Sequence, residues 1–208
     1  MAVNPSRTRR PGGRTRQVTE RLLVAALDIL SEKGVDGLQY EELASRALVG
    51  RATVYRRWPT RNDLVRDVLT RFAETSVPIH DTGDIVRDLT IFLYSFAEAS
   101  STPTGRAVSQ ILLRRAGADD GLHRLGLELL DRRTDDLQGR LDQASAAGQL
   151  PPTEASFVNM MLAGPAQWFV LRRTQAFTMS HASEIVELVV AGLWRHHIDQ
   201  GLNSSPID

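Results

Sequence analysis

The 208-residue sequence contains no cysteine, which excludes disulfide bonds, thiol nucleophiles and cysteine-ligated zinc sites. It also lacks any apolar run near the roughly 18 residues that a membrane-spanning helix needs. The N-terminus is basic, but no apolar segment of a secretory signal follows it. These absences predict a cytoplasmic protein.

Common catalytic and nucleotide-binding motifs are missing as well. The sequence has no G-x-S-x-G turn, no phosphate-binding P-loop and no G-x-G-x-x-G fingerprint. His181 and Glu184 form an H-x-x-E pair, and His196 and His197 follow, but a di-metal helical bundle needs paired Glu-x-x-His motifs. We therefore predict no catalytic residue, no metal ligand and no cofactor, and we expect these histidines to cap and solvate the last helix.

The charges are unevenly distributed although their sum is zero. Residues 1–71 hold 14 Arg or Lys against 8 Asp or Glu, whereas residues 72–208 hold 11 against 17. A chain of this kind can present one basic end to a polyanion. Residues 1–14 mix Arg, Pro, Gly and Ser without an apolar period, which predicts a disordered arm. This arm either adds contacts to phosphates or a minor groove, or is a solvated tail.

Apolar residues recur at helical spacing along most of the chain. The pattern predicts an all-α protein of about nine helices, at residues 15–33, 40–47, 51–57, 60–76, 84–100, 104–116, 119–147, 157–171 and 185–194. We expect four parts: the arm at 1–14, an N-terminal three-helix helix-turn-helix domain at 15–76, a C-terminal helical ligand-binding and dimerisation bundle at 77–200, and a flexible tail at 201–208.

Residues 40–57 are typical of a helix-turn-helix, because two short helices flank the turn Leu48-Val49-Gly50 and a longer helix precedes them. Val54 and Trp58 are four residues apart and are predicted to face inward. The outward face then carries small and basic side chains that suit a major groove, namely Arg51, Ala52, Thr53, Tyr55, Arg56 and Arg57.

Residues 16–72 resemble the DNA-binding domain of the TetR family of transcriptional repressors. The resemblance is carried by the pattern T-[LV]-Y-x-x-[FW]-P-x-[KR]-x-x-L at residues 53–64 and by earlier apolar and glycine positions: Ala25, Ala26, Leu30, Gly34, Leu43, Ala44 and Ala47. It implies that Tyr55 and Arg61 contact phosphates and that Arg51 to Thr53 lie near base edges. The predicted DNA-binding residues are Gln39, Tyr40, Gly50, Arg51, Ala52, Thr53, Tyr55, Arg56, Arg57 and Arg61.

The chain departs from the family pattern at three positions. Leu48 stands where the family usually has Gly in the turn. Gly50 and Gln39 stand where Ser and Thr usually cap the two short helices. These changes remove two hydroxyl groups that could contact phosphates, although backbone amides can take their place.

The last two predicted helices, FVNMMLAGPAQWFVL at 157–171 and IVELVVAGLW at 185–194, are apolar on nearly all sides. Such helices need burial on all sides, which favours a four-helix interface between two copies over a monomer core. The TetR family also dimerises through its last two helices, and MLAGP at 161–165 is similar to one of its C-terminal classes. The predicted interface residues are Trp168, Ile185, Leu188, Val189, Gly192, Leu193 and His196.

Aromatic, methionine and polar residues of the C-terminal half are candidates for a regulatory pocket, although they could equally form a plain core. They are Phe92, Phe96, Gln110, Arg114, Met160, Met161, Gln167 and Trp168. Together the patterns predict a homodimeric repressor that binds a palindromic double-stranded DNA operator and is released by a small-molecule effector. The alternatives are a constitutive architectural DNA-binding protein and an all-helical enzyme.

Overall fold

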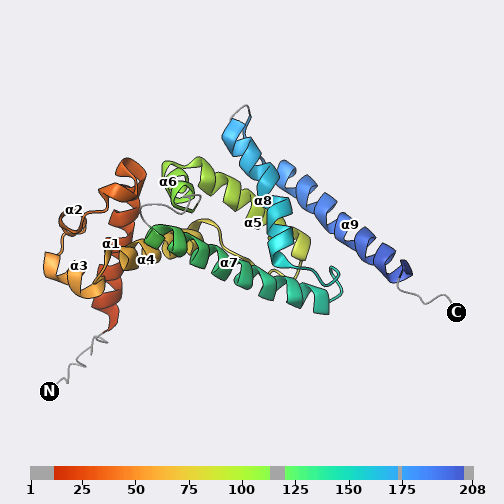
Figure 1. Ribbon diagram of the computed structural model, residues 1–208, viewed down its shortest axis with the longest axis horizontal. Coiled ribbons are helices and arrows are strands. Elements are labelled where there is room, and N and C mark those ends of the chain that lie inside the picture. Colours follow the sequence, from red (N-terminus) through yellow and green to blue (C-terminus); the bar gives the residue numbers. More distant parts are fainter. Residues whose placement is uncertain (1–11, 113–119, 173–174, 204–208) are drawn as a thin grey trace, which may run out of the picture. The chain divides into compact units, whose positions relative to one another are not determined.

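The computed structural model describes residues 12–112, 120–172 and 175–203, and within these ranges the chain forms helices and no strands (Figure 1). This confirms the predicted all-α class. The elements are α1 Gly12–Lys33, the 3-10 helix η1 Val35–Gly37, α2 Tyr40–Arg46, α3 Arg51–Arg57, α4 Arg61–Ser76, α5 Ile85–Ser101, α6 Pro103–Leu112, α7 Asp120–Ala146, α8 Ala155–Arg172 and α9 Met179–Asn203.

The last helix, α9, is the one whose observed bounds differ most from the predicted ones. The apolar run indicated residues 185–194, but the helix spans Met179–Asn203 because polar turns extend it at both ends. Its start is fixed by Thr178, whose Oγ1 accepts a hydrogen bond from the His181 amide at 3.3 Å. The Nδ1 atom of His181 in turn accepts from the Thr178 amide at 3.1 Å. This pair forms a reciprocal N-terminal cap, so His181 has the capping role expected of it.

The chain divides into two compact units, residues 1–68 and 69–208. The division falls inside α4, eight residues before the boundary at 76/77 that the sequence indicated. Each unit has its own apolar core. Residues 12–14, predicted to belong to the disordered arm, instead begin α1, and residues 201–203, predicted to belong to the flexible tail, end α9. The rest of the predicted arm and tail, 1–11 and 204–208, lies outside the described residues.

In the first unit, α1 to α4 enclose a small core of fully buried side chains. Gly34 ends α1 with φ of +67°, the left-handed backbone that glycine adopts without strain, as the sequence predicted. Arg46 of α2 ties this helix to α1 through Glu32, at 2.6 Å. The core includes Leu22, Ala26, Ile29, Leu30, Leu43, Val54, Trp58 and Leu64.

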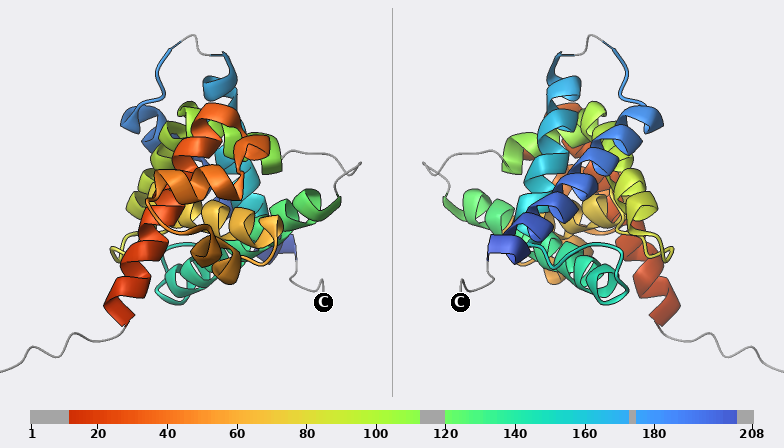
Figure 2. Two further views of the ribbon diagram at one scale, coloured as in Figure 1. Left: turned by 90° about the vertical axis from the view of Figure 1, so that its left-hand side faces the viewer. Right: turned by 90° about the vertical axis from the view of Figure 1, so that its right-hand side faces the viewer.

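In the second unit, α5 is the central helix. Helices α6, α8 and α9 pack against it, and α7 packs against α6 and α8; Figures 1 and 2 show α9 running alongside α5 and α8. The core contains one apolar face from each of four helices: Leu89 and Leu93 of α5, Leu137 and Leu141 of α7, Val158 and Leu162 of α8, and Val186 and Val190 of α9.

A buried ion pair connects α5 to α7. The Asp88 and Arg140 side chains are 2% and 6% exposed, and Arg140 Nη2 lies 2.6 Å from Asp88 Oδ2. The Thr82 hydroxyl also donates to Asp88, at 2.6 Å. Burial by itself raises the pKa of Asp88, but the hydrogen bonds from Thr82 and Arg140 outweigh it and hold the pKa below its usual value.

Candidate nucleic-acid interface and effector cavity

Helix α3 is anchored by two buried side chains. Val54 is fully buried and Trp58 is 2% exposed, which confirms their predicted inward direction. The Trp58 indole Nε1 donates to Asp67 Oδ2 at 2.8 Å, so the ring is held by a hydrogen bond as well as by packing. The opposite face of α3 carries the exposed residues Arg51, Ala52, Tyr55, Arg56 and Arg57, with Thr53 half-buried beside them.

Two tyrosines support this face. The Tyr40 hydroxyl donates to the Trp58 carbonyl at 2.7 Å, and its ring meets the Tyr55 ring edge-on with centroids 4.7 Å apart. Burial raises the pKa of Tyr40, so this phenol remains a donor at neutral pH. Tyr40 was predicted to contact DNA, and in the structure its hydroxyl instead links α2 to the end of α3.

Glu41 lies on the same face and was missed by the sequence analysis. Its carboxylate accepts a hydrogen bond from the Tyr55 hydroxyl at 3.3 Å and lies 3.7 Å from Arg51 Nη1. A phosphate that binds the Tyr55 hydroxyl or Arg51 Nη1 would therefore meet the negative charge of Glu41. The signal that could have found it is its place in the first turn of α2, directly after Tyr40.

Gln39 and Arg61, both predicted to contact DNA, each donate a hydrogen bond to a backbone carbonyl of η1. Gln39 Nε2 donates to the Asp36 carbonyl at 3.0 Å, and Gln39 makes no side-chain cap for α2. Arg61 Nη2 donates to the Val35 carbonyl and lies 3.5 Å from the Asp36 carboxylate, while its buried Nε has no hydrogen-bond partner. These contacts hold the guanidinium of Arg61 against η1 through Nη2, and its Nη1 atom takes no part in them.

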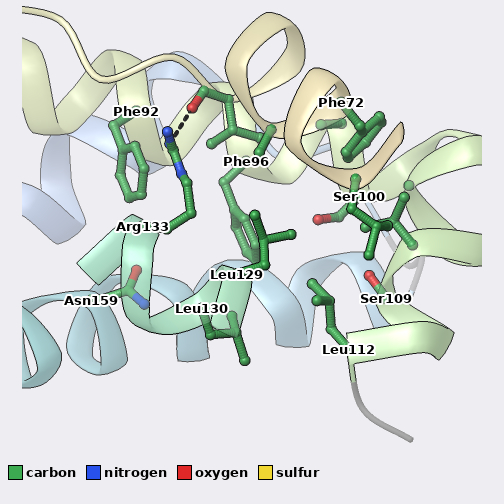
Figure 3. A pocket seen from close by; sticks show the side chains of 16 residues that line it. Phe72, Phe92, Phe96, Ser100, Ser109, Leu112, Leu129, Leu130, Arg133 and Asn159 are labelled. Atoms are coloured by element: carbon green, nitrogen blue, oxygen red, sulfur yellow. Dashed lines mark hydrogen bonds between the residues drawn. The ribbon is translucent and has the colours of Figure 1, made fainter. Parts of the chain in front are cut away.

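A cavity of about 130 Å³ lies inside the second unit (Figure 3). The end of α4 and helices α5 to α8 line it, mainly with Phe72, Phe92, Phe96, Val108, Leu112 and Leu129. Ser100, Ser109, Arg133 and Asn159 are the polar side chains of its wall. Gly105 permits the close packing of α6 on α5 at this point, because a β-carbon on Gly105 would lie 1.9 Å from the Ala99 carbonyl oxygen.

An open groove of about 710 Å³ shares five wall residues with this cavity, among them Phe96 and Asn159. It follows one face of α8 past Ser156, Met160 and Gln167. The cavity and the more open groove are therefore contiguous, and one ligand can extend from the first into the second.

The predicted pocket residues are only partly brought together. Phe92 and Phe96 line the cavity, and Met160 and Gln167 line the groove. Three others line neither space, because Gln110 is exposed on α6 and because Met161 and Trp168 lie on a different, exposed face of α8. Arg114 lies outside the described residues. Arg133 and the α4 residue Phe72 were not predicted, since nothing in their local sequence separates them from surface Arg and core Phe.

The outer faces of α8 and α9 expose large apolar side chains. Within one chain, each helix buries only one face, so the expected burial on all sides is not met by a single copy. Leu188 is 74% exposed and Trp168 is 58% exposed, with Gly192 and His196 on the same side of α9 as Leu188. The predicted interface residues Ile185, Val189 and Leu193 are half-buried against their own core.

Other kinds of site find little support in the described part of the chain. No group of three or more His, Asp or Glu side chains there could hold a metal ion. None of the described helices is both long and apolar enough to cross a membrane. The His181 ring packs near Phe169 and Phe177, with centroids 4.9 and 5.9 Å away.

Comparisons with known proteins agree with this geometry. Residues 22–68 match the family described as bacterial regulatory proteins, tetR family, and residues 79–189 match the tetracyclin repressor-like C-terminal domain. The HTH-type transcriptional regulator AqdR of Rhodococcus erythropolis is 38% identical over 89 residues, which cover 43% of each chain. The match thus spans less than half the length of that curated relative.

Solved structures share the whole fold. The TetR family transcription regulator SCO0332 superposes with a TM-score of 0.66 at 25% identity, over 85% of this chain and 98% of that one. The transcriptional regulator FadR from Bacillus subtilis, solved in complex with stearoyl-CoA, gives a TM-score of 0.59 at 18% identity, over 84% of this chain and 98% of that one. With both family domains matched in order along the sequence, the chain belongs to the TetR family of bacterial regulatory proteins.

Proposed function

We propose that the protein is a homodimeric transcriptional repressor that binds a palindromic operator through α3 and is released by a small molecule in the second unit. The observation that carries the proposal is the outward face of α3. Three arginines and a tyrosine are exposed there, while Val54 and Trp58 hold the helix from behind. A rigid short helix with this face suits the major groove, where Arg reads guanine and Tyr and Arg hold phosphates.

A dimer follows from the exposed apolar faces of α8 and α9. Two helix-turn-helix units related by a two-fold axis would meet half-sites about 34–36 Å apart. Leu188 and Trp168 are large apolar side chains that one copy leaves exposed, and a partner that covers them would remove this apolar area from water. Glycines on this surface, Gly164 and Gly192, have open space around them and would let a second copy approach closely.

The effector part of the proposal rests on the cavity. Its walls include α4 residues, and α4 is continuous from Arg61, near the end of α3, to Ser76. A ligand that prefers one position of α4 would therefore change operator affinity, and a coupling of about 1–3 kcal/mol would change it about 5- to 150-fold. FadR, which shares the fold, was solved with stearoyl-CoA. A constitutive architectural protein would need no such cavity.

A gel-shift titration against the DNA that flanks the protein's own coding region tests the DNA-binding part. We expect saturable binding that is much tighter than binding to a random duplex of equal length. Equal affinity for both duplexes would contradict the proposal.

The substitution Arg51→Ala tests the assignment of α3. Loss of one base-edge contact should weaken binding by about 1–3 kcal/mol, or about 5- to 150-fold. The matched control is Arg124→Ala, which removes the same charge from an exposed position of α7. Equal effects of the two substitutions would show that α3 does not read the operator.

A further inference from the structure

Among the residues that the structure describes, the cavity wall carries one cation between aromatic and aliphatic side chains, and we infer that this residue, Arg133, binds the carboxylate of the effector and transmits its presence to α4. The inference rests on the proposed function and deepens it. It assigns the effector to the small organic carboxylates with an apolar ring or chain, and it names the contact that such a ligand would break.

Arg133 is positioned by α7 so that its guanidinium lies against the cavity wall beside Phe92 (Figure 3). Its side chain is 21% exposed, and its Nη1 lies 4.0 Å from Asp136 Oδ2. Its Nη2 donates to the Val77 carbonyl at 2.5 Å. A guanidinium has five N–H donors, and the bond to Val77 uses one of them.

The electrostatic setting favours an anion over a neutral ligand. Burial lowers the pKa of Arg133, although Asp136 and Glu74 oppose this, so the cation is held in a poorly solvated place. The other polar groups of the wall, Ser100, Ser109 and Asn159, are neutral and can orient a ligand without selecting its charge. A carboxylate can take two parallel N–H bonds from a guanidinium, and such charge-assisted pairs are about twice as strong as neutral hydrogen bonds.

The dimensions of the cavity limit the rest of the ligand. Its volume of about 130 Å³ is close to that of cavities that accommodate a benzene ring. Phe96 and Asn159 also border the open groove, so a longer chain can continue along α8. The expected ligand is therefore a monocarboxylic acid with one aromatic ring or a medium-length alkyl chain.

The same contact supplies a route to the DNA-binding unit. Val77 directly follows the last residue of α4, and the α4 residues Leu69, Phe72 and Ala73 line the same cavity. A carboxylate that takes two parallel N–H bonds from Arg133 would turn the guanidinium toward itself and so weaken the bond from Nη2 to the Val77 carbonyl. Occupied and empty cavities would then differ in this one bond, while the ion pair between Arg132 of α7 and Glu74 of α4, at 3.7 Å, is the same in both. A difference of contacts between two states is what a ligand needs to shift a conformational equilibrium.

Isothermal titration with acids and their uncharged amides tests the ligand class. The probes are 4-phenylbutyrate, 8-phenyloctanoate and decanoate, each paired with its primary amide. We expect at least one acid to bind the full-length protein about 10-fold or more tightly than its amide, as a charged hydrogen bond implies. Equal affinity for each acid and its amide, or no binding of any acid at millimolar concentration, would overturn the inference.

Arg133→Met should abolish the preference for the acid, and without any ligand it should weaken operator binding about 5-fold or more, because the tie to Val77 is lost. The control is Arg124→Met, which removes the same charge from an exposed position of α7. It should change neither property. An unaltered preference in Arg133→Met would overturn the inference.

If Arg133→Met does not fold, as judged by circular dichroism, Arg133→Lys replaces it. Lysine keeps the charge but not the planar fork, so the preference for the acid should fall and not disappear. An unchanged preference would again contradict the role of Arg133.

Failure of the wild-type protein to bind its flanking DNA would refute the proposed function. Normal DNA binding without discrimination between acid and amide would refute only this inference.

Discussion

Leu48, in the turn between α2 and α3, differs from the residue usual in the family, and the difference strains the backbone. Its φ is +54°, in the left-handed region that a β-carbon disfavours, and its side chain is 84% exposed. The leucine therefore gains little from burial while its backbone is strained by about 1–2 kcal/mol. The family usually has Gly here, and the backbone of this chain has kept the conformation that Gly would adopt.

Leu48→Gly should stabilise the helix-turn-helix by about 0.5–1 kcal/mol, because relief of strain exceeds the added entropy of the unfolded chain. Hydrogen exchange at the Leu43 and Val54 amides measures this locally. Leu48→Ala is the control, since it shortens the side chain but keeps the β-carbon, and it should not slow exchange. Faster exchange in Leu48→Gly than in the wild type would contradict this explanation.

Single residues were predictable where spacing or a motif marked them. Val54 and Trp58 could be placed inward from their separation of four and from the pattern that contains them. Glu41 and Arg133 could not, because nearly all cations of this chain are Arg and acidic residues occur in most of its helices. What distinguishes these two is a contact with a residue distant in sequence or on another helix, and no local pattern encodes such a contact.

Between elements, the pair of Asp88 and Arg140 holds α5 to α7. Removing one partner of a buried pair typically costs about 3–5 kcal/mol, since the other charge stays buried. Asp88→Asn should therefore lower the free energy of unfolding at pH 7 by about 3 kcal/mol.

The pH dependence of this loss has a definite sign. The pKa of Asp88 is lowered on folding, so its contribution is fully present above the unfolded pKa of about 3.9 and is lost as pH falls through the folded pKa. The difference between wild type and Asp88→Asn should accordingly shrink below about pH 4. Urea unfolding from pH 7 to pH 2.5 measures it, with the exposed Asp135→Asn as control. A difference that stays constant over this range would show that Asp88 is not ionised in the native state.

Helices were easier to predict than their ends. The apolar period located every described α-helix, yet the polar first turns of α9 and two residues at the start of α8 were left out of the predicted ranges. The pocket was the harder case. Periodicity shows which side of a helix is buried, but not whether the buried side meets another helix or a cavity, and so Met161 and Trp168 were assigned to the pocket although they lie on an exposed face.

Operator binding by the whole protein requires pairing of two copies, which we propose to occur through α8 and α9. Leu188→Arg should abolish the dimer, because it places a charge in the centre of the proposed interface. The monomer should still fold, because the Leu188 side chain is 74% exposed within its own chain. Leu193→Arg, at another predicted interface residue, is less suitable because Leu193 also packs against its own core.

Sedimentation velocity measures the loss of the dimer. A gel shift should show operator binding weakened by at least about 10-fold, since a monomer has one helix-turn-helix where the dimer has two. Asp135→Arg, an exposed change on α7, is the control and should remain dimeric. A dimer that survives Leu188→Arg would place the interface elsewhere.

The most direct test of the central claim is the mass of the complex with DNA, measured by sedimentation of the full-length protein with a labelled duplex from its own flanking region. The account predicts two chains on each duplex, bound through a single cooperative transition, and their release when the cavity is occupied. One chain per duplex, or the same binding to an unrelated duplex, would contradict it.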